Sequence, residues 1–199
     1  MDVPSPVVER CQRGEPEAFD ELVRLTHRHV YSLALRIMGN ADDAAEVTQE
    51  TYIRLLKAIR SFRGEAKFST WLYQVTSSVA ITALRKRARR KHEVPLETPE
   101  LEQMSGPDDP ALGAERRELH EQLEAAIQSL PEGYRAVVVM KDVYGLSLAE
   151  AGRQLGISEG AAKVRLFRAR QRLRSLLGAN VAVNGAGPAK RGGQDDGMS

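Results

Sequence analysis

The chain has 199 residues, enough for one or two domains, and its 42% hydrophobic and 28% charged content is that of a soluble globular protein. The net charge of +2 does not by itself indicate a nucleic-acid partner, and the single cysteine excludes an intrachain disulfide and a cysteine-based zinc site. No apolar run approaches the roughly 18 residues of a membrane span, and the N-terminus lacks the apolar core of a signal peptide. We therefore expect a cytoplasmic protein that reaches a membrane only through a partner.

Two helices are predicted near the N-terminus. Apolar residues recur at helical spacing from Phe19 to Met38, with Pro16 at a tolerated first-turn position and Gly39 as the expected end. Asn40 is expected to cap the next helix, whose first turns are acidic. The predicted buried positions of that second helix are Val47, Tyr52, Ile53, Leu55, Leu56 and Ile59.

A loop and a basic helix follow. The segment 61–70 breaks the periodicity and contains Gly64, which predicts a loop, and a third helix is expected from about Ser69 to Lys91. Six cations occupy the seven positions 85–91, more than are needed to complement a helix dipole. Aromatic residues lie beside this basic track, namely Phe62, Phe68, Trp71 and Tyr73. Aromatic planes next to cations suit unpaired bases and their phosphates, which predicts a single-stranded DNA ligand, with Phe68 and Trp71 partly buried.

The stretch 94–114 divides the chain. It is acidic, contains no lysine or arginine and is rich in proline and glycine, which predicts a flexible linker that tethers two domains and does not contact DNA. The stretch 179–199 is low in bulky residues and is predicted to be disordered. The predicted fold class is therefore all-α, with two small helical domains, residues 1–93 and 115–178, the second a four-helix unit.

The second domain is expected to open with a helix from about Ala114 to Gln128, in which Leu119, Leu123 and Ile127 face inward. Pro131 is expected to start another helix that Gly145 ends.

The strongest local pattern is Leu148–Arg174, which predicts two helices joined by a tight turn. Ser147 and Glu150 form a capping box, Gly156 supplies the left-handed end of the first helix, and Ser158 caps the second. The second helix carries six cations and no acidic residue after its first turn. Apolar positions at three- and four-residue steps can face a core: Ala162, Leu166, Ala169 and Leu173. This arrangement is typical of a helix-turn-helix, whose second helix enters the major groove of DNA.

Patterns that indicate an enzyme are absent from the sequence. We find no strand pattern, no phosphate-binding glycine motif and no histidine, aspartate or glutamate set at metal-ligand spacing. The sequence therefore predicts a protein without catalysis, cofactor or metal.

Two segments together carry a family resemblance. DDAAEVTQETYIRLLKAIRSFRGEAKFSTWLYQV resembles region 2, and LEAAIQSLPEGYRAVVVMKDVYGLSLAEAGRQLGISEGAAKVRLFRARQRLR resembles region 4, of the extracytoplasmic-function sigma factors, a small two-domain class of bacterial RNA polymerase sigma factors. The resemblance covers about residues 15–92 and 115–177, with no region 3 between them. It implies a non-enzymatic alternative sigma factor that binds core RNA polymerase, directs it to specific promoters and helps to melt the −10 region.

The resemblance also implies the functional residues. The surface that docks on the clamp helices of the largest polymerase subunit is formed by Asp43, Glu46, Gln49 and Glu50. The single-stranded −10 element is bound by Arg63, Lys67, Phe68, Ser69, Trp71, Tyr73, Arg85, Lys86, Arg87, Arg89 and Arg90. The duplex −35 element is read by Ser158, Glu159, Lys163, Arg165, Arg168 and Arg170. Further implied partners are the polymerase flap and an anti-sigma factor, often anchored in the membrane.

Several positions depart from the pattern that is common in the family. Ser78 and Thr82 stand in place of Asn and Asp, Ala161-Ala162 in place of Thr-Val, and Val164 in place of Ser. Two other hypotheses stay open. A stand-alone LuxR-type regulator would bind duplex operators without polymerase, although it leaves the region 2 segment unexplained. A sigma-like interaction protein without promoter activity is compatible with the departures.

Overall fold

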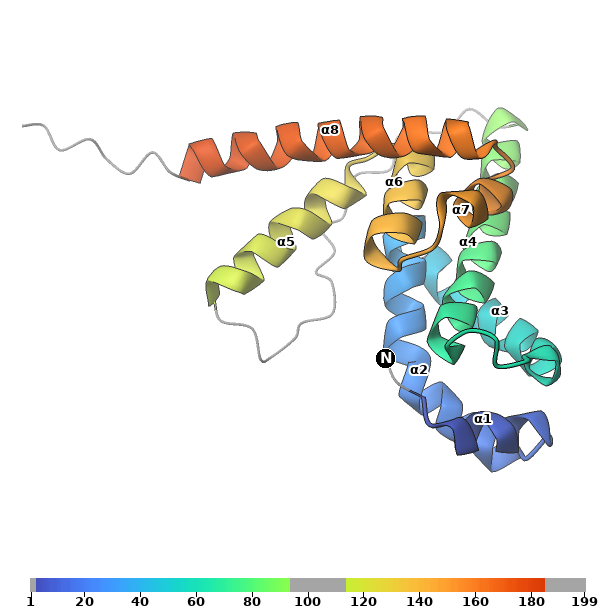
Figure 1. The fold of residues 1–199 in the computed structure, drawn as a ribbon. Coiled ribbons are helices and arrows are strands. Elements are labelled where there is room, and N and C mark those ends of the chain that lie inside the picture. Colours follow the sequence, from blue (N-terminus) through green and yellow to red (C-terminus); the bar gives the residue numbers. More distant parts are fainter. Residues whose placement is uncertain (1–2, 94–113, 185–199) are drawn as a thin grey trace, which may run out of the picture.

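The computed structural model describes residues 3–93 and 114–184, with side chains described for 3–89 and 117–178. All regular structure within these ranges is helical, which confirms the all-α prediction (Figure 1). The predicted linker, apart from Ala114, and residues 185–199 of the predicted tail lie outside the described residues.

The N-terminal half contains α1 (Ser5–Gln12), α2 (Pro16–Met38), α3 (Ala41–Ala58), the short 3₁₀ turn η1 (Ile59–Ser61) and α4 (Phe68–Glu93). The predicted helix ends are confirmed: α2 stops at Gly39, whose φ is +81°, and the Asn40 side chain accepts a 2.8 Å hydrogen bond from the backbone N–H of Asp43. Helix α4 begins at Phe68, so the end of the predicted loop is helical. Helix α1 was not predicted, although its buried Val7, Val8 and Cys11 have helical spacing.

The C-terminal half contains α5 (Ala114–Gln128), α6 (Glu132–Val138), the π-helical turn η2 (Val139–Val143), α7 (Leu148–Leu155) and α8 (Glu159–Asn184). The capping box of α7 is present, since the backbone N–H of Glu150 donates to Ser147 Oγ and Glu150 Oε2 accepts from the backbone N–H of Ser147. Gly156 is left-handed at φ +65°, and Ser158 Oγ accepts from the N–H of Ala161. Because α8 continues to Asn184, the segment 179–184 is helical and not disordered as predicted.

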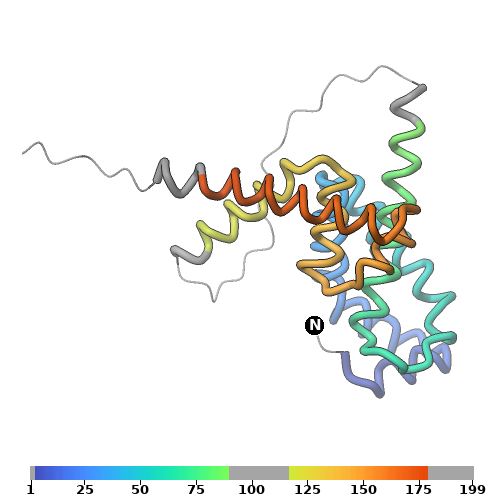
Figure 2. The backbone as a smooth tube through the Cα atoms, turned by 45° about the horizontal axis from the view of Figure 1, so that its top comes forward, coloured from blue at the N-terminus to red at the C-terminus, as the bar shows by residue number. Residues whose placement is uncertain are grey.

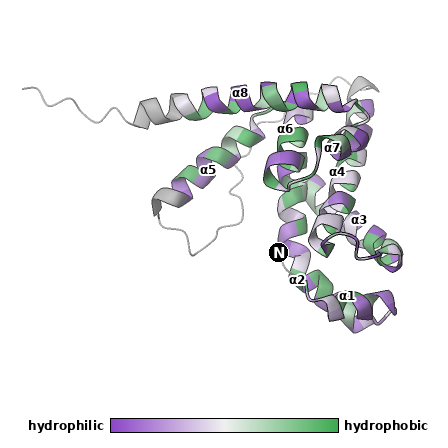
Figure 3. Cartoon of the chain, viewed as in Figure 1, coloured by the Kyte–Doolittle hydropathy of each residue, from purple (hydrophilic) through white to green (hydrophobic). Residues whose placement is uncertain are grey.

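Four positions that were predicted to be buried are exposed. Leu119 and Leu123 lie on α5, which diverges from the body of the molecule, and Leu119 is 59% exposed. Ile53 and Leu56 lie on the outer face of α3, and Leu56 is 58% exposed. Figure 3 shows that apolar and polar residues alternate along the ribbons of α3 and α5. The periodicity placed apolar residues on helices correctly but could not show which face a neighbouring helix covers.

The two halves share one apolar core. Helices α2 and α4 of the first half pack against α6, η2 and α7 of the second (Figure 2). The shared cluster joins buried residues of α2 and α4, such as Leu35, Ile81 and Leu84, to Ala136 and Met140 of the second half. The two predicted domains therefore lie docked against each other in this structure.

A buried ion pair crosses the contact between the halves. Arg36 of α2 donates three hydrogen bonds of 2.6–3.0 Å to the Glu124 carboxylate of α5 and one of 3.0 Å to the Tyr144 hydroxyl. The side chains of Arg36 and Glu124 are only 16% and 10% exposed. Burial acts to lower the pKa of Arg36, but the hydrogen bonds to Glu124 and Tyr144 outweigh it and raise that pKa. The Arg36 guanidinium is thus held by partners from both α5 and the segment that follows η2.

A second buried arginine caps the end of α2. Arg135 of α6 donates to the carbonyls of Ile37 at 3.1 Å, Met38 at 3.2 Å and Gln128 at 2.9 Å. Burial lowers the pKa of its guanidinium, although the nearby Glu132 carboxylate acts in the opposite direction. A Cβ at Gly39 would lie 2.9 Å from Arg135 Nη1, so the glycine makes this close approach possible.

Candidate nucleic-acid interface

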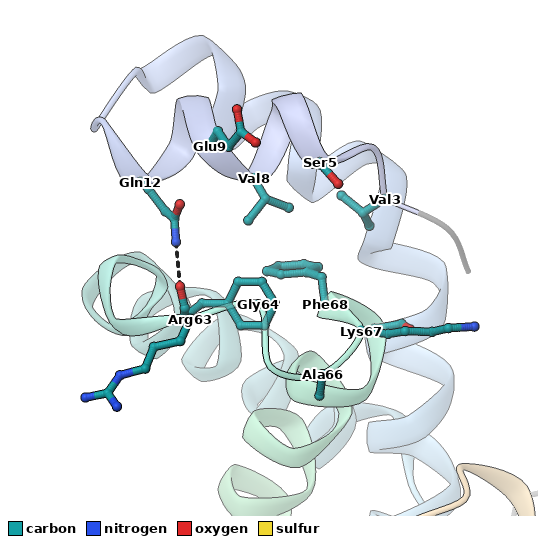
Figure 4. Close-up of a pocket in the computed structure, with 12 residues that line it drawn as sticks. Val3, Ser5, Val8, Glu9, Gln12, Arg63, Gly64, Ala66, Lys67 and Phe68 are labelled. Atoms are coloured by element: carbon teal, nitrogen blue, oxygen red, sulfur yellow. Dashed lines mark hydrogen bonds between the residues drawn. The ribbon is translucent and has the colours of Figure 1, made fainter.

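The loop between η1 and α4 forms one wall of a groove of about 640 Å³, and α1 forms the other (Figure 4). Three aromatic rings pack behind the loop, with centroid separations of 5.4 Å between Phe62 and Phe68 and 5.2 Å between Phe62 and Trp71. The Gln12 amide of α1 donates to the carbonyls of Phe62 at 2.8 Å and Ile59 at 3.2 Å, which ties the start of the loop to α1. The groove therefore has one helical wall, α1, and one loop wall that aromatic rings support.

Four of the residues predicted for the −10 element line this groove: Arg63, Lys67, Phe68 and Ser69. Trp71 is half-buried, as expected, whereas Phe68 is more deeply buried than expected, with 8% of its surface exposed. Val8 and Gln12 were missed because α1 was not predicted. Figure 4 shows the Val8 side chain directed at Phe68 across the groove.

Tyr73 does not join this group. Its ring packs against Tyr144 of the C-terminal half with a centroid separation of 4.6 Å, and burial raises its pKa. Its neighbour Gln74 donates to the Glu150 carboxylate of α7. In the docked molecule this part of α4 is therefore covered by the helix-turn-helix half.

The cations at the end of α4 also differ in their surroundings: some contact other parts of the chain and some do not. Arg85, Lys86 and Arg89 are exposed, whereas Arg87 is half-buried. Arg85 donates to the carbonyl of Gln154 at 2.9 Å, and Arg87 forms 2.5 Å ion pairs with Asp43 and with Glu132. The side chain of Arg90 lies outside the described residues. Only part of the predicted phosphate track is thus open in the docked state.

The residues predicted for polymerase binding lie together. Asp43, Glu46, Gln49 and Glu50 line a groove between α3 and α4 with Ile53 and Arg87. Glu46 and Gln49 are exposed, whereas Asp43 pairs with Arg87, and Glu50 accepts a 2.8 Å hydrogen bond from Arg54. Sequence reasoning missed Ile53 as a surface residue, because apolar periodicity was interpreted as burial.

The residues predicted to read the −35 element lie along the first turns of α8. Glu159, Lys163 and Arg168 are exposed, while Arg165 is half-buried, with its guanidinium beside Gly133 of α6. Arg170 is exposed but donates 2.9 and 2.5 Å hydrogen bonds to Asp142, which raise its pKa. The buried positions Ala162, Leu166 and Ala169 confirm the predicted core face of this helix.

Among the residues that the structure describes, no cluster of His, Cys, Asp and Glu is arranged to hold a metal ion. None of the described helices is both long enough and apolar enough to cross a bilayer.

Comparison with protein families matches both halves. The sigma-70 region 2 family matches residues 22–90, and the sigma-70 region 4 family matches residues 120–173.

Whole-chain relatives agree with these matches. The ECF RNA polymerase sigma factor SigE of Mycolicibacterium smegmatis is 38% identical over 168 residues, which cover 80% of this chain and 62% of that protein. The RNA polymerase sigma-H factor of Pseudomonas aeruginosa is 33% identical, over 86% of this chain and 92% of that protein. The ECF RNA polymerase sigma factor SigW of Bacillus subtilis is 31% identical, over 85% of this chain and 94% of that protein.

Solved structures share the fold. The sigma factor RpoE from Bartonella quintana, in complex with the anti-sigma factor NepR, has a TM-score of 0.57 at 21% identity, over 81% of this chain and 98% of that one. CnrH, in complex with the cytosolic domain of CnrY, has a TM-score of 0.52 at 24% identity, over 87% and 96%. The order of the two matched regions and the similarity to whole relatives show that this chain belongs to the extracytoplasmic-function RNA polymerase sigma factors of the sigma-70 family.

Proposed function

We propose that this chain is an alternative sigma factor that binds core RNA polymerase, directs it to specific promoters and helps to melt the −10 region. The observation that supports this most is that one chain carries both an aromatic groove beside a basic helix and a helix-turn-helix. These two elements suit two different states of DNA, unpaired and duplex. The chain contributes by binding alone, and the polymerase performs the chemistry.

The −10 element is assigned to the groove between α1 and the loop. The groove is large enough for an unstacked base, its floor is aromatic, and Arg63 and Lys67 on the loop can approach the adjoining phosphates. Lys86 and Arg89 extend the positive surface along α4. Capture of an unpaired base here would stabilise the melted strand, because the base no longer returns to its duplex partner.

The −35 element is assigned to α8, which a helix-turn-helix places in the major groove. Lys163 and Arg168 are exposed for contact with phosphates or base edges. The polymerase clamp is assigned to the groove between α3 and α4, where Glu46 and Gln49 are exposed and Ile53 adds an apolar contact.

Binding both promoter elements requires the two domains to separate. The names of the elements place them about 25 base pairs apart, or roughly 85 Å of duplex at about 3.4 Å per base pair. In the docked molecule α4 and α7 touch, since Arg85 donates to the Gln154 carbonyl. The segment 94–113 can extend to roughly 70 Å at about 3.5 Å per residue, which is sufficient when the widths of the two domains are added.

The family relationship also supports regulation by an anti-sigma factor, since the solved structure of RpoE from Bartonella quintana contains the anti-sigma factor NepR. We assign the protein to the cytoplasm, held at the membrane where the anti-sigma partner is anchored there.

The test is run-off transcription with purified chain, core polymerase and a pool of genomic promoter fragments. Transcripts that depend on the chain are the expected result, and sequencing them gives the promoter elements. Specific binding to duplex operators without polymerase would instead favour a stand-alone regulator. Polymerase binding without any transcript would favour an interaction protein.

A further inference from the structure

Helix α1 precedes the part of the chain that matches sigma-70 region 2, residues 22–90, yet it borders the groove assigned to the −10 element. Its buried residues Val7, Val8 and Cys11 belong to the same apolar cluster as Phe68, the first residue of α4. Since close-packed residues of one core do not shift independently, α1 and the start of α4 keep a set separation across the groove.

The loop between η1 and α4 is held at its two ends. At the first end, the Gln12 amide of α1 donates to the Phe62 carbonyl at 2.8 Å, a hydrogen bond that Figure 4 draws. At the other end, the Lys67 carbonyl accepts from the backbone N–H of Trp71 at 3.2 Å. Between these ends lies Gly64, whose φ is +75° and where an added Cβ would meet no atom within 4 Å beyond the adjoining residues. The tip of the loop is therefore open, and its position is set at the two ends.

The two hydrogen bonds of the Gln12 amide differ in importance. The Ile59 carbonyl, 3.2 Å from the amide, also accepts from the backbone N–H of Phe62 at 3.1 Å, so it has a second donor. Within the described residues, Gln12 alone donates to the Phe62 carbonyl. Because the peptide group is planar, this bond orients the whole link between Phe62 and Arg63 and thus the direction in which the loop leaves η1.

We propose that Gln12 is a positioning residue for the −10 site, which holds the start of the loop so that Arg63 and Lys67 lie beside the unpaired base in the groove. The inference rests on the proposed function of this groove. A loop that already stands in its binding position saves the conformational entropy that ordering it would otherwise cost. Without the amide donor the loop can take other positions about Gly64, and capture of the base weakens.

The test compares single-stranded −10 fragments bound to the polymerase that carries this chain, with the sequence taken from a promoter recovered in the run-off pool. One fragment is complete, and each of the others lacks one base but keeps its sugar and phosphate. The ratio of their affinities measures capture of that base, because the phosphate contacts are common to both fragments. Gln12→Met keeps the length of the side chain and removes the donor. We expect it to lower the largest ratio of the wild type by about twofold to tenfold, the range for one ordinary hydrogen bond.

Three further variants make the result specific. Gln12→Lys restores a donor of similar reach and should recover the ratio, since its added charge acts on both fragments alike. Gln12→Glu cannot donate when ionised and should behave as Gln12→Met does, so the test remains available if the apolar variant does not fold. Gln122→Met removes an amide donor from a surface hydrogen bond to Glu118 on α5 and should leave the ratio unchanged.

The ratio separates positioning from a merely structural role, which would lower the stability in denaturant unfolding and weaken both fragments by the same factor. An unchanged ratio in Gln12→Met, or a ratio that Gln12→Lys does not recover, overturns the inference and leaves the sigma function intact. Binding of the −35 duplex should be equal in all variants, and a parallel loss there would also overturn it.

Two outcomes with the wild type concern the proposed function. A holoenzyme that transcribes but loses no affinity at any abasic position removes the −10 assignment of the groove and the role of Gln12 with it. Absence of transcription from every promoter means that the proposed function itself has failed.

Discussion

Helices α4 and α8 are both strongly basic, yet their cations have different surroundings. In α4, Arg85 donates to a backbone carbonyl of α7, and Arg87 lies between Asp43 and Glu132. In α8, Lys163 and Arg168 are exposed, and Arg170 alone of the predicted readers pairs with a carboxylate, Asp142. A basic run thus shows that a helix can bind an anion, but the helix packed against it determines which of its charges are free. In the docked molecule each helix keeps exposed cations, Lys163 and Arg168 on α8 and Lys86 and Arg89 on α4.

The largest effect is expected from breaking the buried ion pair between Arg36 and Glu124, which joins the two docked halves. Arg36→Met leaves the buried Glu124 carboxylate with only His120, 3.7 Å away, beside it, which costs the docked arrangement about 3–5 kcal/mol. Because separation of the domains hydrates Glu124 again, we expect the variant to open. Small-angle X-ray scattering should then give a larger radius of gyration than for the wild type.

The matched control is Arg54→Met, which removes an exposed pair with Glu50 within one helix. Such pairs contribute little, so the radius should not change. An unchanged radius for Arg36→Met as well would show that the buried pair does not hold the domains together.

The next effect concerns the arginine at the end of α2. Arg135→Ala removes the donor from three carbonyls, those of Ile37, Met38 and Gln128. The Met38 carbonyl keeps a 3.3 Å hydrogen bond from Arg87, so the loss falls on the carbonyls of Ile37 and Gln128. We expect it to cost about 1–3 kcal/mol, which denaturant unfolding can measure.

Two glycine variants test the close approach of Arg135 to Gly39. Gly39→Ala and Gly64→Ala both place a side chain at a left-handed residue, but only the Cβ at Gly39 meets Arg135. Gly39→Ala should therefore destabilise the protein more than Gly64→Ala. Equal losses would mean that Arg135 moves away at no cost.

Salt dependence compares the two basic helices directly. If each cation neutralises one phosphate, Lys86→Ala should reduce the slope of log affinity against log salt by about 0.7 on a single-stranded −10 fragment, and Lys163→Ala by about 0.9 on the duplex element. Arg87→Ala should change the slope little, because Asp43 already neutralises this guanidinium. Fluorescence anisotropy of the holoenzyme at several salt concentrations measures all three, and an equal change for Arg87→Ala would contradict the assignment.

The smallest effect concerns the cap of α7. Hydrogen bonds from the Ser147 hydroxyl and backbone N–H lower the pKa of Glu150. The ionised Glu150 carboxylate therefore stabilises the folded protein above its unfolded-state pKa, near 4.5. This stabilisation is lost as the pH falls through the lower pKa that Glu150 has in the folded protein. Glu150→Gln should cost about 0.5–1 kcal/mol at pH 7, and the difference from wild type should shrink below pH 4.5. A difference that does not vary with pH would rule out the carboxylate as its source.

Local chemistry made much of the fold predictable. Gly39, Asn40, Ser147 and Gly156 end or begin helices through contacts within a few residues, and each prediction was confirmed. Burial was predicted less well. Leu56 and Leu119 have helical spacing, but no local rule says whether another helix covers them.

Contacts between distant segments were the least predictable part of the candidate site. Tyr73 lies among the aromatic residues of the loop in sequence, yet packs against Tyr144. Arg36 and Glu124 are 88 residues apart, and nothing in either segment indicates the other. Residues that act through such pairs can be found only once the docking of the two halves is known.

The shared apolar core has a consequence for the order in which the chain is made. The ribosome releases α2 and α4 before α6 and η2 exist, and N-terminal domains generally fold first. Leu35, Ile81 and Leu84 are then without Ala136 and Met140, which complete their cluster. The newly made first half thus presents an apolar surface until the second half emerges to cover it.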